Sequence, residues 1–460
     1  MTILATKIEA LKRSFGGEIL LPGNDAYESA RKIWNAMIDK HPAIIARCST
    51  TPDVVLAVNF ARDNGLLLAV RGGGHNIAGN AMCDDGIVVD LSQMKAASVD
   101  PGTRRVMIEG GATLADLDAA TQAHGLATPL GINSTTGVAG LTLGGGFGWL
   151  SRKYGMTIDN LESAEVVTAA GEVVHASATE HPDLFWALRG GGGNFGVVTR
   201  FEFRLHPVGP DLLSGLIVYP ISEAKSVLQQ YREFAAKAPD ELSVWAILRQ
   251  APPLPFLPVE THGKEIIVLA LLYAGDPKQG EPLIEPLRKL GMPLGEHVGV
   301  QPYTAWQQAF DPLLTFGARN YWKSHNFSTL DDGLFDAVIE YIIKLPLPQC
   351  EIFFGAVGGA TTKPAPDAAA YAHRDAQFVM NVHGRWDEPA DDARCIGWAR
   401  DFFKASAPFA SGGVYVNFLT ADEGDRIRAA YGPNYDRLAQ VKRKYDPGNL
   451  FRVNQNIRPG

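Results

Sequence analysis

A histidine stands among glycines in the stretch 71-RGGGHNIAGN-80, directly after the apolar run 66-LLLAV-70. Glycine has no side chain to obstruct its backbone, so a ligand can come close to the N–H groups of such a loop. An imidazole in the same loop can reach that ligand through a ring nitrogen. The other interpretation is a tight turn that contains a structural or surface histidine, and the stretch by itself leaves both open.

Three more glycine clusters, at 110–111, 144–148 and 190–196, favour the ligand-binding interpretation. Few basic residues flank them, so an extended anionic cofactor would be held mainly by backbone amides. The last cluster contains 191-GGGNFG-196, which has the glycine spacing of a Rossmann nucleotide site. That fingerprint has to follow a strand and open a helix, whereas here a helix-like segment precedes it and a strand-like segment follows. The order argues against a Rossmann domain.

The composition narrows the possible partners. The chain has 460 residues, 46% of them hydrophobic, and a formal net charge of −8, which allows two or more domains with cores of their own. The sequence has no lysine- and arginine-rich run of the kind that binds a phosphate backbone, so no nucleic-acid partner is expected. No apolar run reaches the roughly 18 residues of a membrane span, so no membrane partner is expected either. With no secretory signal, the prediction is a cytoplasmic protein. Four separated cysteines match no metal-ligand spacing and are expected to be reduced and buried, with no metal bound: Cys48, Cys83, Cys350 and Cys395.

Short apolar or alternating runs predict strands, and longer runs with helical periodicity predict helices. The predicted strands are 43–48, 66–70, 86–91, 105–111, 165–174, 197–205, 216–221, 243–250, 266–275, 351–359, 376–386 and 414–418. The predicted helices are 51–65, 113–125, 183–190, 222–238, 279–291, 333–345 and 390–406. The second half of the chain lacks glycine-rich loops, which indicates a second domain with a sheet covered by helices on one side.

Four segments together resemble the FAD-linked oxidases of the vanillyl-alcohol oxidase superfamily, and specifically its berberine-bridge-enzyme-like group: 43–79, 137–161, 184–203 and 434–457. The resemblance implies an α+β fold with two domains. One is an FAD-binding fold of the vanillyl-alcohol oxidase (PCMH) type, and the other is an inserted substrate domain built on an antiparallel sheet flanked by helices. The implied bounds are 1–206 for the FAD-binding domain, with a core at about 38–206, 207–410 for the substrate-binding domain, and 411–460 for a C-terminal segment that returns to the FAD-binding domain.

The resemblance also implies FAD as the cofactor, bonded at its 8α-methyl carbon to a ring nitrogen of His75. Many members have a second bond through a cysteine in the segment that reads 131-GINSTTG-137 here, and Asn133 stands at the cysteine position. A single covalent link is therefore expected. The residues implied to bind the cofactor are Arg71, Gly72, Gly73, Gly74, His75, Asn76, Gly79, Asn133, Thr136, Gly137, Val138, Gly140, Gly144, Gly145, Gly148, Asp159, Val197 and Asn417.

A second departure concerns catalysis. The group commonly has a catalytic tyrosine at the end of a Y-x-N-Y sequence, whereas this chain reads 415-YVNF-418. Phe418 cannot take a proton, which puts the usual base for an alcohol in doubt and favours an amine or a heterocycle. The period of two in 378-FVMNVHGRW-386 puts Asn381 and His383 on one strand face, which either lines a site or meets solvent. The candidate catalytic residues are Tyr321, Lys323, Glu351, Asn381, His383 and Asn417.

These features predict an oxidase that transfers a hydride from a small amine, alcohol or secondary metabolite to covalently bound flavin and then to O2, giving hydrogen peroxide. Val138 favours O2 as the acceptor, because the family associates a small or valine side chain there with oxygen access. A small-molecule substrate and O2 are the expected partners, and the sequence leaves the oligomeric state open. Two alternatives stand beside this prediction: a carbohydrate or oligosaccharide oxidase of the same family, and a non-catalytic flavin-binding protein, for which Phe418 is the main support.

Overall fold

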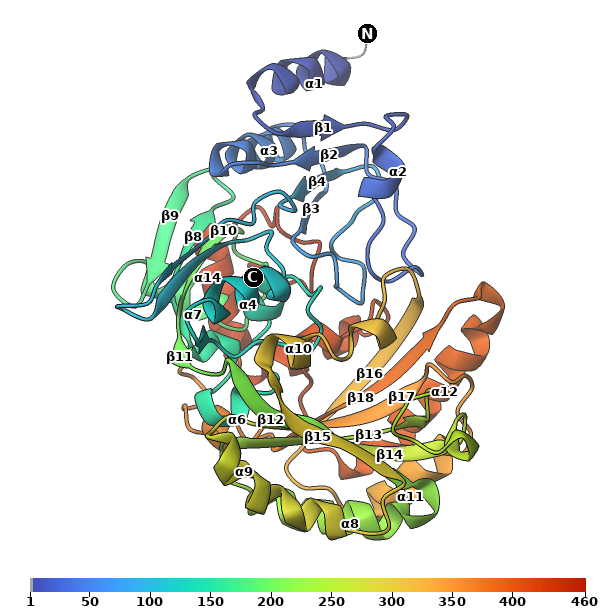
Figure 1. The fold of residues 1–460 in the computed structure, drawn as a ribbon. Helices are drawn as coiled ribbons and strands as arrows, with labels where there is room; N and C mark the ends of the chain where they lie inside the picture. The colour runs from blue at the N-terminus through green and yellow to red at the C-terminus, as the bar shows by residue number, and fades with distance from the viewer. Residues whose placement is uncertain (1–2) are drawn as a thin grey trace.

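The computed structural model describes residues 3–460, whose strands form three main sheets (Figure 1). In the first, β1-β2-β4-β3, the strands β2, β4 and β3 are parallel and β1 pairs antiparallel at the edge. The second, β5-β6-β10-β8-β9, is antiparallel. The strands are β1 (Glu18–Leu20), β2 (Ile44–Arg47), β3 (Leu68–Arg71), β4 (Ile87–Asp90), β5 (Ala97–Asp100), β6 (Arg105–Glu109), β8 (Leu161–Val167), β9 (Val173–Ser177) and β10 (Val197–Arg204), with a separate pair of β7 (Leu126–Ala127) and β11 (His206–Pro207).

The third sheet is antiparallel and has seven strands in the order β15-β12-β14-β13-β17-β18-β16. They are β12 (Asp211–Pro220), β13 (Leu242–Gln250), β14 (Glu265–Tyr273), β15 (Gly295–Pro302), β16 (Arg319–Phe327), β17 (Glu351–Ala356) and β18 (Phe378–Trp386). Helices α8 (Ala224–Ala235), α11 (Asp332–Ile342) and α12 (Asp392–Ser406) pack against one face (Figure 1). The predicted α+β fold with an antiparallel sheet flanked by helices is therefore confirmed.

Local signals fix where several helices begin. Helix α3 (Thr51–Asp63) follows Thr50, whose hydroxyl accepts from the backbone N–H of Asp53 while the Asp53 carboxylate accepts from the N–H of Thr50. Helix α4 (Leu114–Gln122) has the same reciprocal cap between Thr113 and Asp116. The other helices are α1 (Ile3–Ser14), α2 (Tyr27–Ala30), α5 (Val138–Leu143), α6 (Ser151–Tyr154), α7 (Pro182–Leu188), α9 (Pro277–Ile284), α10 (Tyr303–Gln307), α13 (Ile427–Tyr431) and α14 (Tyr435–Tyr445).

The end of the chain leaves the third sheet and packs against α7 and the second sheet (Figure 1). Lys442 of α14 is fully buried there, and its ammonium group donates to the carbonyls of Asn194 and Phe451 and to the carboxylate of Asp446. A buried charge needs such partners, so these bonds fasten the tail to the glycine loop at 190–196. The domain bounds at 206 and 410 stay a prediction.

Some predicted elements differ in the structure. The strand predicted at 165–174 is two strands, β8 and β9, separated by a turn. The strand predicted at 414–418 is wrong: the segment contains one turn of 3-10 helix, and the side chain of Asn417 donates to carbonyls of α5. Strands β15 and β16 were not predicted. In β16 the polar residues Asn320 and Ser324 are buried, which hides the apolar alternation of an ordinary strand.

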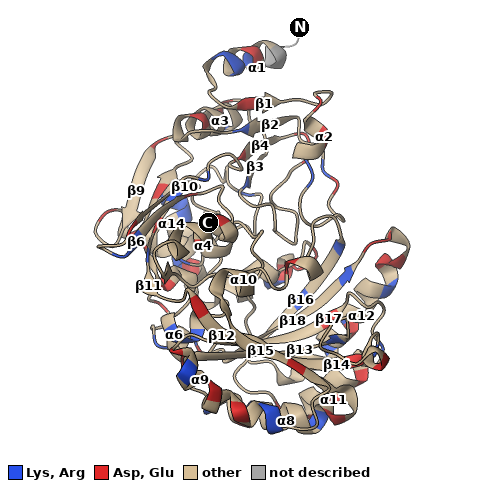
Figure 2. Cartoon of the chain, viewed as in Figure 1, with Lys and Arg blue, Asp and Glu red and all other residues tan. Residues whose placement is uncertain are grey.

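The surface mixes both charge signs, as the helices α8, α9 and α11 show (Figure 2). In the part of the chain that the structure describes, no helix is long and apolar enough to cross a membrane. Over the same residues, no group of three or more His, Cys, Asp or Glu side chains could hold a metal ion. All four cysteines are buried and free. Burial raises the pKa of the Cys48 thiol well above its usual value, which keeps this thiol protonated and unreactive.

Candidate active site

A cavity of about 350 Å³ lies between the third sheet, the glycine loops and the C-terminal segment. We call its two parts the glycine end and the sheet end. The glycine end is lined by Gly72, Gly73, Gly74, His75, Asn76, Gly137, Gly140, Gly192, Gly193, Gly196, Val197, Asn454 and Gln455. The sheet end is lined by Leu216, Trp245, Ile247, Arg249, Leu254, Val268, Trp322, Glu351, Phe353, Asn381, His383 and Phe418.

Two backbones meet at the glycine end. A Cβ atom on Gly73 would lie 2.3 Å from the backbone N of Gly137, and a Cβ atom on Gly137 would lie 2.4 Å from the N of Gly73. No side chain fits between them, so close packing requires both glycines. By contrast, a Cβ atom on Gly140 or Gly193 would meet no described atom within 4 Å, although both residues line the cavity. The exposed backbone there has room for an extended anionic cofactor and offers it N–H groups.

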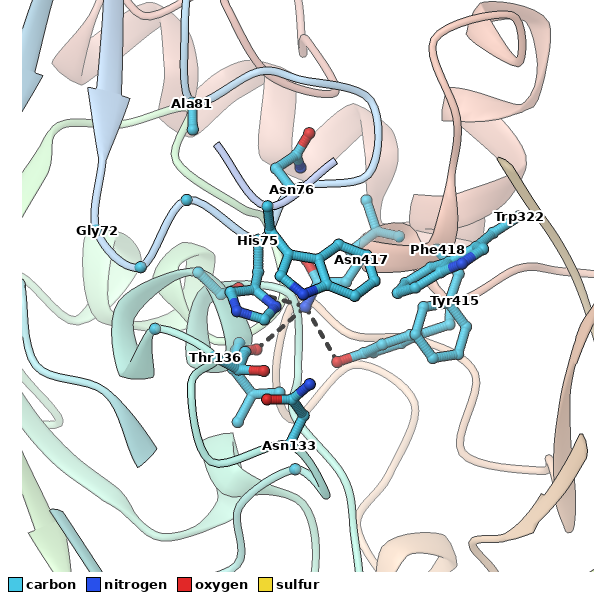
Figure 3. Close-up of a pocket in the computed structure, with 18 of the residues that line it drawn as sticks. Gly72, His75, Asn76, Ala81, Asn133, Thr136, Trp322, Tyr415, Asn417 and Phe418 are labelled. Carbon is cyan, nitrogen blue, oxygen red and sulfur yellow. Dashed lines mark hydrogen bonds between the residues drawn. The ribbon is translucent and has the colours of Figure 1, made fainter. Parts of the chain in front are cut away.

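His75 belongs to the lining of the glycine end, among the residues that Figure 3 draws. Its ring stacks on Trp34 with 5.1 Å between centroids, and its Nε2 lies 2.9 Å from the hydroxyl oxygen of Thr135. Burial, together with the Arg385 guanidinium, holds the pKa of His75 below its usual value, so the ring is neutral at neutral pH. Among residues 3–460 no group is hydrogen-bonded to Nδ1, which leaves that nitrogen for a ligand.

One row of side chains crosses the cavity face of the third sheet. The strand register pairs Trp322 of β16 with His383 of β18, then His383 with Glu351 of β17, and Glu351 with Arg249 of β13. Residues paired directly across antiparallel strands share a face, and all four line the cavity. Sequence reasoning missed Arg249 and Trp322 as site residues, because the register of strands distant in the chain has no local signal.

The Glu351 carboxylate is held in its charged form. Arg249 Nη1 donates to Glu351 Oε2 over 2.8 Å, and Glu351 Oε1 lies 3.4 Å from His383 Nδ1. Burial by itself would raise the pKa of Glu351, but nearby positive charge, that of the Arg249 guanidinium above all, outweighs it, and the pKa lies below its usual value. The cavity therefore contains a carboxylate that can accept a proton.

The hydrogen bonds around His383 define which of its two ring nitrogens carries the proton. The amide of Asn320 donates through its NH2 group to Ala318 O over 2.8 Å, and its oxygen accepts from Arg385 over 3.3 Å. That oxygen also lies 3.2 Å from His383 Nε2, which must therefore donate to it. Burial lowers the pKa of His383, so the ring is neutral and its Nδ1 lone pair faces Glu351. Glu351 and His383, which we call the proton pair, can take up one proton between them.

Phe418 forms part of an aromatic wall. Its ring meets Trp322 edge to face with 5.4 Å between centroids and lies 4.9 Å from the ring of Tyr415. The Tyr415 hydroxyl accepts from the Asn417 side-chain N–H over 3.0 Å (Figure 3) and from the backbone N–H of Gly146 over 3.0 Å. These bonds fasten the 415–418 turn to the glycine loops, and the turn presents to the cavity a ring without an exchangeable proton.

The structure separates the predicted site residues into two groups. Those along the cavity, whose roles stay predictions, are Gly72, Gly73, Gly74, His75, Asn76, Asn133, Thr136, Gly137, Gly140, Val197, Glu351, Asn381, His383 and Asn417. Those outside its lining are Arg71, Gly79, Val138, Gly144, Gly145, Gly148, Asp159, Tyr321 and Lys323.

The outer group from the cofactor prediction has structural partners instead. Arg71 donates to the carbonyl of Ala30, and both oxygens of Asp159 accept from Arg374 over 2.8 Å. Val138 is buried in the core of the second sheet. The four glycines of this group lie against other atoms, so that an added Cβ would come within 3 Å of a neighbour. The neighbour is Ile38 for Gly79, Asn417 for Gly144, Met156 for Gly145 and the Leu130 carbonyl for Gly148. These residues therefore pack around the segments that line the cavity and do not line it themselves.

Tyr321 and Lys323 point to the face of the third sheet opposite Trp322, because successive strand residues alternate. Tyr321 donates its hydroxyl proton to Asp422 over 2.6 Å, and Lys323 donates to the same carboxylate over 3.1 Å. Arg400 of α12 also donates to Asp422, over 2.8 Å. Burial and Asp422 raise the pKa of Tyr321 above its usual value. The prediction that these two residues belong to the site is corrected: they form an ion network beneath α12.

Comparisons with known proteins agree with this architecture. Residues 42–177 match the family model described as FAD binding domain, and residues 414–458 match that described as Berberine and berberine like. The chain is 33% identical to an FAD-linked oxidoreductase of Dictyostelium discoideum, over 97% of this chain and 95% of the relative. It is 30% identical to a xylooligosaccharide oxidase of Thermothelomyces thermophilus, over 93% and 89%. The solved structure of 6-hydroxy-D-nicotine oxidase from Arthrobacter nicotinovorans is 30% identical and matches with a TM-score of 0.88, over 97% and 99%.

The residues at the glycine end fit FAD. The open backbone at Gly140 and Gly193 suits its diphosphate, and the sheet end leaves space for a substrate. Both matched segments, 42–177 and 414–458, contribute to the lining. The chain therefore belongs to the berberine-bridge-enzyme-like group of FAD-linked oxidoreductases.

Proposed function

We propose that the protein is an oxidase of a small amine, alcohol or secondary metabolite, with aromatic and heterocyclic amines favoured, and that it releases hydrogen peroxide. Bound FAD would supply the hydride acceptor and pass the electrons to O2. The observation that carries the proposal is the proton pair, Glu351 and His383, in a cavity end that is otherwise mostly aromatic and aliphatic.

The proton pair supplies what such a reaction needs. An amine enters as an ammonium ion and must lose a proton before it can give up a hydride. The Glu351 carboxylate attracts the cation, and the proton pair lies in the cavity, where it can take the proton. An alcohol would use the same pair in place of the tyrosine that Phe418 replaces.

The lining favours an amine over an oligosaccharide. Leu216, Ile247, Leu254, Val268 and Phe353 offer no hydrogen bonds from their side chains, and buried sugar hydroxyls without partners would each cost roughly 1–3 kcal/mol. An oligosaccharide oxidase is therefore the second candidate, supported by the related xylooligosaccharide oxidase. The presence of the proton pair argues against a binding protein without turnover.

A substrate panel tests the proposed reaction. Aromatic and heterocyclic amines, simple alcohols and xylo- and cello-oligosaccharides are each mixed with the protein, and hydrogen peroxide release and anaerobic bleaching of the flavin are measured. We expect both signals with amines at lower concentrations than with sugars. Turnover of sugars alone would favour the second candidate, and a flavin that no compound reduces would overturn the proposal.

We further propose that the cofactor is covalently bonded to His75 and to no second residue. The neutral ring of His75 and its Nδ1, to which no residue of the described range 3–460 is hydrogen-bonded, support His75, and Asn133 offers no thiol. We expect the yellow colour to stay with the polypeptide after acid precipitation of the wild type and to be released entirely from His75→Ala. A His75→Ala protein that kept its colour in the pellet would exclude this residue as the link.

A further inference from the structure

The turn at 133–135 contacts His75 through a short chain of hydrogen bonds (Figure 3 shows His75 and Asn133). The Asn133 oxygen accepts from the backbone N–H of Thr135 over 3.0 Å. The Asn133 NH2 group faces the carbonyl of Leu314 over 3.4 Å. Because a backbone N–H can only donate, the amide is oriented, and its oxygen is the atom that faces Thr135.

This orientation decides where the hydroxyl proton of Thr135 lies. Thr135 Oγ1 is 2.7 Å from Asn133 Oδ1 and 2.9 Å from His75 Nε2. The hydroxyl has one proton, and Oδ1 can only accept, so Thr135 donates to Asn133 and must accept from His75. The opposite assignment would leave two oxygens 2.7 Å apart with no proton between them. His75 Nε2 therefore carries the ring proton.

A second contact keeps the ring from gaining another proton. Trp34 contacts both His75 and Arg385: its ring stacks on the imidazole with 5.1 Å between centroids, and the Arg385 guanidinium lies 5.3 Å from the Trp34 ring centroid. Burial, and after it the positive charge of Arg385, lower the pKa of His75 and so disfavour an imidazolium. In the resulting neutral ring the only lone pair in the plane is at Nδ1, to which none of the described residues is hydrogen-bonded.

We infer that Asn133 and Thr135 are positioning residues for cofactor attachment: they hold His75 as the tautomer with hydrogen on Nε2, so that Nδ1 is the nucleophile. This inference rests on the proposed covalent link at His75. Asn133 would then act in cofactor attachment by orienting Thr135, although it stands at the position where other members of the group have a second linking cysteine.

With hydrogen on Nε2 and the lone pair on Nδ1, the atoms and electrons of the bond-forming reaction balance. His75 Nδ1 gives its lone pair to the flavin 8α-methyl carbon, and one C–H bond of that methyl breaks. The two electrons of that bond reach O2 by way of the flavin ring. The C–H proton and the Nε2 proton supply the two hydrogens of the hydrogen peroxide formed, so no further oxidant is required.

The test follows covalent incorporation instead of turnover. Full-length apoprotein is mixed with FAD, and flavin fluorescence in the acid-precipitated polypeptide is measured over time. Thr135→Val removes the hydroxyl and should slow incorporation about tenfold, the equivalent of one lost hydrogen bond of about 1.4 kcal/mol. Asn133→Leu should act similarly. Thr135→Ser and Asn133→Asp, which restore the acceptor chain, should recover most of the rate, and Thr179→Val is a control for loss of an exposed threonine hydroxyl.

A direct measurement on the wild type tests the inference even where a variant fails to fold. In wild-type apoprotein labelled with 15N-histidine, the His75 resonances should report a protonated Nε2 and an unprotonated Nδ1, and the mature link should be at Nδ1. The opposite tautomer, or equal incorporation rates in Thr135→Val, Thr135→Ser and wild type, would overturn the inference. A wild type that never acquires covalent flavin would instead overturn the proposed link itself.

Discussion

Replacing Glu351 by glutamine is expected to lower kcat/KM by about 10²–10⁴-fold, the range of a positioned general base. The carboxylate lines the cavity, and its lowered pKa keeps it in the ionised form that a base must have. Glutamine has nearly the same shape but cannot take the proton and leaves Arg249 without its counter-charge. The measurement is steady-state peroxide release with the best substrate of the panel, together with the flavin content. Glu260→Gln, at an exposed position, is the matched control.

The pH profile separates this role from a structural one. Protonation of the proton pair removes its function, so kcat/KM of the wild type should fall as the pH drops. The acid limb should lie below pH 6.5, the ordinary pKa of histidine, because burial lowers the pKa of His383. In Glu351→Gln any remaining limb should move to lower pH, since the carboxylate is a group that raises the pKa of His383. An unchanged profile and rate in a folded, flavin-loaded variant would show that another group takes the proton.

The change Gly73→Ala is expected to destabilise the folded protein by about 3 kcal/mol or more and to abolish FAD binding. The added Cβ would lie 2.3 Å from the N and 2.6 Å from the Cα of Gly137. Both are backbone atoms, so neither can move aside by rotating a side chain. The loop at 72–76 would be pushed away from α5, and the glycine end of the cavity would open. Denaturant unfolding followed by circular dichroism measures the stability, and the flavin absorbance measures binding.

Substitutions at two other glycines distinguish an effect on backbone packing from an effect on cofactor binding. Gly397→Ala in α12 meets no described atom within 4 Å and should leave stability equal or higher, by up to about 1 kcal/mol from helix propensity. Gly140→Ala should also fold, since its Cβ has room, but it should bind FAD more weakly because the methyl enters the cavity. If Gly73→Ala unfolded at the same denaturant concentration as Gly397→Ala, the close contact with Gly137 would not be a requirement of the fold.

Much of the cofactor end could be predicted from the sequence because its signals are local. The glycines around His75 mark a backbone that something must approach, and Asn133 and Phe418 are single replacements that are visible in the chain. The period of two in β18 correctly grouped Asn381 with His383, since alternation is a property of the strand itself. These features need no knowledge of distant neighbours.

The substrate end depended on pairings between distant segments. Arg249 lies about 100 residues from Glu351 in sequence, and only the register of β13 with β17 brings them to 2.8 Å. The sequence predicts no strand at β16, so nothing in it indicates that Tyr321 and Lys323 lie on the face that α12 covers. The sequence alone thus determined that a cofactor cradle exists and which histidine stands in it. The tertiary structure decided which charged groups face the substrate, because strand register and helix cover are set by the packing of the whole core.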